Sequence, residues 1–112
     1  MVRKIINSIN PILFISIHQN YFNVEKYNGI HVFYKGDYEL GKYLQIKLNP
    51  NRETKKISNS LYMYNKIKSE GLLIECGFLS NAKDRKKLTD EKYQLELSKN
   101  IAKAIKEYYS NK

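Results

Sequence analysis

The chain has 112 residues, 42% of them apolar, which suits a single domain with one hydrophobic core. Its formal net charge is +9, and only Arg3, Arg52 and Arg85 among the basic residues are Arg. Because base readout relies on the bidentate geometry of Arg, this Lys-dominated charge argues against a nucleic-acid partner. The positive charge suits an anionic wall polymer or lipid surface as a partner. Alternatively, it reflects only a compositional bias toward Lys on solvated helix faces.

Two further classes are excluded by simple counts. No apolar run approaches the roughly 18 residues of a membrane-spanning helix, and the first residues lack the apolar segment and cleavage site of a signal peptide. The single cysteine, Cys76, excludes an intrachain disulfide and a cysteine-rich metal site.

The first predicted element is an amphipathic helix, because apolar residues recur at helical spacing from Val2 to Ile9, before Asn10-Pro11. This helix begins without an N-cap or a preceding strand, which suggests the tail of a larger element. Two strands are predicted next, near residues 12–18 and 29–34, joined by a polar, exposed connection.

The second half of the chain predicts a further alternation of helices and strands. Asp37 caps a helix that ends at Asn49-Pro50, and residues 50–59 form a polar loop. A short strand is predicted at 61–65. The later elements are a buried strand at 72–76, a helical turn near 83–88 and a terminal helix near 90–109. This order favours an α/β fold.

A carboxylate follows the buried strand directly, at Glu75, and His18 ends the earlier strand in the same way. If the two strands are adjacent and parallel, both side chains reach one crevice at the edge of the sheet, where ligands of α/β folds gather. A His and a Glu there suit a metal ligand with a general base, or a proton relay. The competing interpretation is a hydrogen-bonded structural His and a paired carboxylate.

Three other residues are weaker candidates for chemistry. Alternation along a strand places Cys76 on the face opposite Glu75, where a lone cysteine packs as a small apolar residue. His31 lies mid-strand and is interpreted as exposed or hydrogen-bonded. Arg52, in a polar loop, is either solvated or a ligand for a carboxylate or phosphate. A catalytic zinc takes three protein ligands, and these residues alone do not supply them.

Two segments carry a family resemblance: Phe14-Ile-Ser-Ile-His18-Gln-Asn20 and Leu73-Ile-Glu75-Cys-Gly-Phe-Leu-Ser-Asn81, joined by Gly29-Ile-His-Val-Phe-Tyr34. The chain resembles the zinc-dependent N-acetylmuramoyl-L-alanine amidases (the Amidase_3 family), and within them the sporulation type that acts on the spore cortex. The resemblance covers essentially all 112 residues. It implies a central twisted, mostly parallel sheet flanked by helices.

The resemblance also implies a chemistry. The family hydrolyses the amide between N-acetylmuramic acid and the first L-Ala of the peptidoglycan stem peptide. A zinc held by His, Glu and His activates the water, and a further Glu transfers the proton. By position, His18 matches the last zinc ligand, Glu75 matches the catalytic carboxylate and Cys76 matches a non-catalytic position.

The chain departs from the family pattern on its N-terminal side. The family's first strand leads into Gly-His-Gly-Gly, which supplies the first zinc His, and a later helix supplies the zinc Glu; neither is in these 112 residues. Residues 1–112 therefore resemble the C-terminal portion of one catalytic domain, truncated at its N-terminal side. Glu25 and His31 are conceivable substitute ligands, but neither lies at a family ligand position.

These inferences lead to two functional hypotheses. The first is a peptidoglycan amidase whose zinc site and activity are impaired in this truncated chain, and which self-associates or pairs with an upstream fragment. The resemblance places it at the cell wall, outside the cytoplasm, or with the forespore. The alternative is a non-catalytic module that binds the wall through its basic surface or interacts with another protein.

Overall fold

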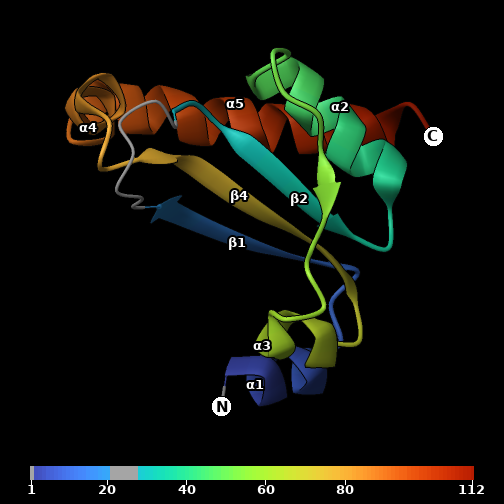
Figure 1. Ribbon diagram of the computed structural model, residues 1–112. Coiled ribbons are helices and arrows are strands. Elements are labelled where there is room, and N and C mark those ends of the chain that lie inside the picture. Colours follow the sequence, from blue (N-terminus) through green and yellow to red (C-terminus); the bar gives the residue numbers. More distant parts are fainter. Residues whose placement is uncertain (1, 21–27) are drawn as a thin grey trace.

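The computed structural model describes residues 2–20 and 28–112, and its centre is a four-stranded, twisted sheet (Figure 1). In spatial order its strands are β1 (Leu13–Asn20), β4 (Glu70–Phe78), β2 (His31–Lys35) and β3 (Lys55–Lys56). The β1–β4 and β2–β3 pairs are parallel, whereas β2 and β4 run antiparallel. The predicted α/β fold with a mostly parallel sheet is confirmed.

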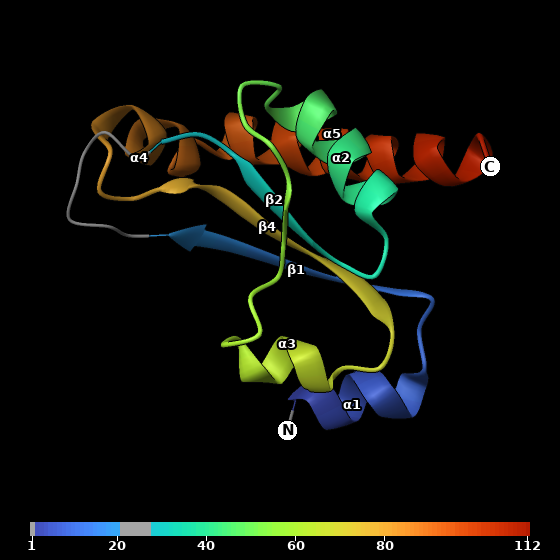
Figure 2. The same ribbon diagram turned by 45° about the vertical axis from the view of Figure 1, so that its right-hand side comes forward.

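The helices form two layers on opposite sides of this sheet, as both views show (Figures 1 and 2). On one side lie α2 (Tyr38–Leu48), α4 (Ala82–Leu88) and α5 (Glu91–Ser110). On the other side lie α1 (Val2–Ile9) and α3 (Tyr62–Lys66), which contact each other. The sheet therefore has a larger, better covered face and a smaller one.

The predicted burial of β4 on both faces is confirmed. Leu72 and Ile74 are fully buried in the larger core, whose other members come mainly from β2, α2 and α5. Leu73 points the other way, into a smaller cluster with Phe14 and Tyr64. A strand in this position contributes side chains to two cores, which explains its continuous apolar sequence.

The helix boundaries follow the capping residues that the sequence offers. Asp37 accepts a hydrogen bond from the Leu40 backbone N–H, Asn81 from Asp84 and Asp90 from Lys92. Each of these side chains satisfies a backbone donor that the first turn of a helix leaves unpaired. The predicted helices near 2–9, 37–48, 83–88 and 90–109 are all confirmed within one or two residues.

The predicted strand at residues 61–65 is wrong, because this segment forms the helix α3. Its alternating aromatic residues suggested a strand, but only Tyr64 is buried, and Tyr62 and Met63 are exposed. The backbone N–H of Asn65 donates to the carbonyl of Leu61, one helical turn earlier. Packing of one aromatic side chain against Phe14 therefore outweighs the local strand propensity.

Two smaller differences concern loops. The strand β1 continues through residues 19–20, which the sequence places in a connection, and most of that connection (21–27) lies outside the described residues. The loop 50–59 contains the short strand β3, which pairs with Phe33 and Tyr34.

Within residues 2–20 and 28–112, no helix is long and apolar enough to cross a membrane.

Candidate functional site

Three polar side chains lie in one row across the sheet. The register of the parallel β1–β4 pair places His18 beside Glu75, and that of the antiparallel β2–β4 pair places His31 on its other side. Register partners point to the same face, with Cβ atoms about 5 Å apart. The predicted adjacency of His18 and Glu75 on parallel strands is confirmed, whereas the place of His31 beside Glu75 was not foreseen.

Glu75 is half-buried at the centre of this row. Its neighbour Cys76 points to the opposite face and is buried in the larger core. Burial raises the pKa of the Cys76 thiol, so the side chain stays a neutral thiol at physiological pH. The prediction that Cys76 serves packing is confirmed, and the chemistry of this strand falls to Glu75.

His18 is exposed at the surface, but its ring is oriented by a neighbour that the sequence did not reveal. Its Nε2 atom shares a hydrogen bond of 2.8 Å with the Tyr64 hydroxyl, which also bonds the Ser16 hydroxyl at 3.0 Å. The Tyr64 ring stacks on Phe14, with centroids 6.1 Å apart. With Nε2 engaged, Nδ1 is the ring nitrogen of His18 that is left for a ligand.

His31 is a buried, hydrogen-bonded residue, which was one of its two predicted states. Its Nε2 atom and the Glu53 carbonyl oxygen are 3.0 Å apart, and its ring contacts that of Phe33. Burial lowers the pKa of His31 below its ordinary value, and the positive charges of Arg52 and Lys55 lower it further. The imidazole beside Glu75 is therefore neutral at pH 7.

The lowered pKa of His31 predicts a pH-dependent stability. The unfolded chain binds the proton more readily, so the contribution of His31 is complete above pH ~6.5 and is lost as the pH falls toward the folded-state pKa. Denaturant unfolding at pH 7.5 and 5.5 measures how much the free energy of unfolding falls on acidification. This fall should be smaller for His31→Gln than for the wild type. An identical loss in both proteins would contradict this origin.

Arg52 lies close enough to His31 to lower its pKa. Its side chain is only partly exposed, and its Nη1 atom is buried without a hydrogen-bond partner within the described ranges. The predicted solvated state of Arg52 is therefore met only in part. The alternative, a ligand for a carboxylate or phosphate, stays a prediction.

Two buried polar side chains hold the strands of the site in place, and neither was predicted. The Gln45 Oε1 atom accepts from the Val32 backbone N–H at 2.7 Å, and its Nε2 atom donates to the Ile30 carbonyl at 3.2 Å. These bonds fix the residues on either side of His31. A sequence gives no signal for such a contact, because its partners lie 13 and 15 residues away.

Asp84 performs the equivalent role at the end of β4. Its Oδ2 atom accepts from the backbone N–H groups of Phe78 and Gly29, each at 2.9 Å. A Cβ atom on Gly77, whose φ is 155°, would lie 3.1 Å from the same oxygen. The glycine of the Glu-Cys-Gly segment thus makes room for the carboxylate that fixes this end of the strand.

A catalytic zinc needs more ligands than this row supplies. Across residues 2–20 and 28–112, no three His, Cys, Asp or Glu side chains are placed to hold one metal ion. His31 directs Nε2 at a backbone carbonyl, and Glu25, the other substitute considered, lies outside the described residues. Only His18, through its Nδ1 atom, is left to serve as an imidazole ligand within the described ranges, so the residues described do not fit a complete zinc site.

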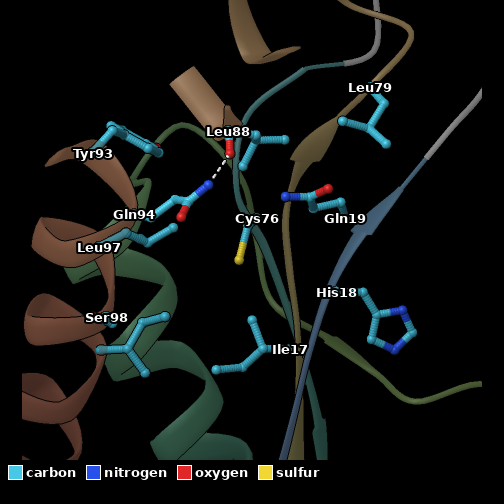
Figure 3. A pocket seen from close by; sticks show the side chains of 11 residues that line it. Ile17, His18, Gln19, Cys76, Leu79, Leu88, Tyr93, Gln94, Leu97 and Ser98 are labelled. Atoms are coloured by element: carbon cyan, nitrogen blue, oxygen red, sulfur yellow. Dashed lines mark hydrogen bonds between the residues drawn. The ribbon is translucent and has the colours of Figure 1, made fainter. Parts of the chain in front are cut away.

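A cleft with a volume of about 470 Å³ lies mainly on the other side of the sheet, between β1 and α5. Figure 3 shows Ile17 and Cys76 pointing into it, while the His18 ring lies on the far side of β1. The cleft reaches the row of polar residues only at its edge, through His18. Its lining is mostly apolar, with Gln19, Gln94 and Ser98 among the polar exceptions, so it suits a packed side chain better than a peptidoglycan strand.

Comparison with known proteins places this geometry in a family. The model of the N-acetylmuramoyl-L-alanine amidase family matches residues 2–107. The germination-specific N-acetylmuramoyl-L-alanine amidase of Bacillus subtilis is 36% identical in an alignment of 118 positions. This alignment covers 97% of this chain and 49% of that protein.

Solved structures give the same result. The CwlD amidase of Clostridioides difficile, in a complex with the GerS lipoprotein, is 38% identical with a TM-score of 0.88, over 98% of this chain and 60% of that one. The amidase AmiC2 of Nostoc punctiforme is 27% identical with a TM-score of 0.83, over 96% and 63% respectively. The chain thus spans about half the length of the curated relatives that it matches. It belongs to the N-acetylmuramoyl-L-alanine amidase family.

Proposed function

We propose that residues 1–112 are the C-terminal portion of an amidase catalytic domain that cleaves the bond between N-acetylmuramic acid and L-Ala in peptidoglycan. The observation that carries the proposal is the parallel register of His18 and Glu75, within a fold that matches 60% of the solved CwlD amidase chain. In this proposal Glu75 is the catalytic carboxylate and His18 is one metal ligand.

The position of Glu75 suits proton transfer. A half-buried carboxylate within β4, flanked by two imidazoles, can accept a proton from a water molecule and donate it to the departing amine of L-Ala. Because His31 is neutral at pH 7, it adds no positive charge beside Glu75.

Zinc is the proposed cofactor of the complete site, and it would supply a polarised carbonyl and an activated water there. His18 would hold it, with its ring fixed by Tyr64. Since the described residues do not complete the ligand set, we assign no step to the metal. Alone, this chain is expected to bind zinc weakly and to hydrolyse little substrate.

The proposed substrate and location follow from the relatives. One is named as germination-specific, and another forms a complex with a lipoprotein. We infer that this protein acts on spore-cortex or cell-wall peptidoglycan, outside the cytoplasm or with the forespore, and that it works with a protein partner. Its net charge of +9 suits an anionic wall polymer.

The direct test is hydrolysis of a muramoyl-peptide, followed by the release of peptide with a free L-Ala amine. It is run with the 112-residue chain alone and with the part of the C. difficile CwlD amidase that has no counterpart in it. Cleavage at this bond by the mixture supports the proposal. Cleavage elsewhere in the substrate, or none under either condition, would contradict it.

The alternative function is a non-catalytic module for wall binding. It is favoured by the incomplete metal ligand set together with the basic surface. Sedimentation with purified sacculi, compared between the wild type and Glu75→Gln, separates the two functions. Equal, salt-sensitive binding without hydrolysis in any combination would favour the module.

A further inference from the structure

The C-terminal helix α5 presents a stripe of lysines to solvent. Its apolar residues Leu97, Ile101 and Ala104 are buried against the sheet. Its lysines are all exposed, and their spacing places them together on the opposite side of the helix. These residues, named the α5 stripe, are Lys92, Lys99, Lys103 and Lys106.

The α5 stripe is not paired with neighbouring carboxylates. In the part of the chain that the structure describes, the one ion pair joins Lys112 to Asp37. The preceding helix, α4, adds Lys86 and Lys87, both exposed, whereas its one acid, Asp84, is buried. The outer side of α4 and α5 therefore carries unpaired positive charge.

Two hollows lie beside this stripe, where the end of α2 meets α5. Their volumes are about 250 and 220 Å³, and Ile30, Leu48 and Tyr93 line both of them. Lys47 lines the first hollow and Lys87 lines the second. Each hollow thus combines one ammonium group with the aromatic ring of Tyr93.

These features match a polymer that alternates phosphate groups with small hydroxyl-bearing units. Phosphates pair with the ammonium groups of Lys as point charges and do not need the planar fork of Arg. The hydroxyl-bearing units suit the hollows, because an aromatic and apolar wall with a few polar groups is the usual lining of a small-molecule site. Charge and shape therefore favour the same class of ligand.

We propose that the α5 stripe and the two hollows bind a phosphodiester polymer of polyol units, such as poly(glycerol phosphate). The inference rests on the proposed function only for its location at the cell wall. The surface belongs to the α2, α4 and α5 side of the sheet (Figures 1 and 2). Glu75 points to the other face, so a polymer bound here leaves the polar row open to substrate.

Two other polyanions suit this surface less well. An anionic bilayer binds interfacial helices through their apolar face, and that face of α5 is already packed on the sheet. Duplex DNA is stiff, with a persistence length of about 50 nm, so its backbone cannot bend into two adjacent hollows. A flexible polymer meets neither obstacle.

The test is the affinity of the 112-residue chain for poly(glycerol phosphate), measured at several salt concentrations. The stripe variant replaces three lysines of α5 by Gln: Lys99, Lys103 and Lys106. The control variant replaces three exposed lysines on the α1 and α3 side by Gln: Lys4, Lys66 and Lys68. Both variants lose the same charge, and circular dichroism checks that both keep the fold.

The stripe variant should bind at least about tenfold more weakly than the wild type at about 0.1 M salt, where only nearby charges act strongly. The slope of log affinity against log salt should fall in magnitude by about 2, since each phosphate contact contributes about 0.7 in a flexible strand. The control should stay within about twofold of the wild type, because charges on the far side are screened. Equal weakening by both variants would overturn the proposal.

Asn100→Trp tests the hollows without changing the charge. Asn100 is exposed and lines the first hollow, so the larger side chain should occupy it and weaken binding several-fold. Unchanged binding by this variant, or tighter binding of the wild type to anionic phospholipid vesicles or duplex DNA, would overturn the proposal. Because no substrate is cleaved, failed polymer binding leaves the proposed amidase activity standing, and failed hydrolysis leaves this surface supported.

Discussion

Replacing Glu75 by Gln is expected to lower amide hydrolysis by the assembled site about 10²- to 10⁴-fold, the usual contribution of general acid–base catalysis. Gln has nearly the same shape but cannot accept a proton from water or return it to a leaving amine. The measurement is the rate at which L-Ala amine is released from a muramoyl-peptide by the chain and the complementary CwlD part. The sheet itself should be unaffected, because Glu75 is only half-buried.

Cys76→Ala is the matched control for this variant. The residue is adjacent, but it points to the opposite face and packs in the larger core. We expect a stability cost of about 1 kcal/mol for the lost contacts, with hydrolysis within a few-fold of the wild type. Similar losses of activity in both variants would indicate damage to the strand, and full activity in Glu75→Gln would contradict the role of the carboxylate.

Replacing Asp84 by Ala is expected to lower the free energy of unfolding by about 2–4 kcal/mol. The carboxylate is buried and accepts from the backbone N–H groups of Phe78 and Gly29, which would both lose their partner. Denaturant unfolding measures this loss of stability. The slope of the unfolding free energy against denaturant concentration should be the same in the variant and the wild type. The variant should also loosen the end of β4, three residues beyond Glu75.

Asp90→Ala tests whether this loss is specific. Asp90 also accepts a backbone hydrogen bond at the start of a helix, but it is exposed, so its loss should cost only about 1 kcal/mol. Equal costs for the two variants would show that Asp84 acts as an ordinary helix cap. A larger cost for Asp84 would show that it joins the end of β4 to the start of β2.

Local signals in the sequence predicted most of the fold. Capping residues such as Asp37 and Asp90 defined the helices, and the apolar run at Leu72–Ile74 defined the central strand. The adjacency of His18 and Glu75 was predicted on the condition that their strands are neighbours and parallel; the structure meets this condition, although both strands continue beyond these residues. These features depend on residues close together in the chain.

The features that were missed depend on distant residues. Tyr64 packs in a helix rather than a strand because Phe14, Ser16 and His18 surround it, about 50 residues earlier in the chain. His31 became a neighbour of Glu75 only through the antiparallel register of β2 and β4. Neither arrangement leaves a periodic pattern that a sequence could show.

The sequence predicted an uncovered edge or face, but it did not predict that this edge would be β1. The sequence predicted that missing strands would leave an edge or face exposed, and the structure locates this exposure at Ile15 and Ile17.

The central claim, that this chain supplies part of an amidase site, is tested most directly by measuring zinc content and muramoyl-peptide hydrolysis together. The purified 112-residue chain should hold much less than one zinc per molecule and show background turnover. Addition of the complementary CwlD part should raise both, and neither should rise with His18→Ala. Stoichiometric zinc and robust turnover by the 112-residue chain alone would contradict the account.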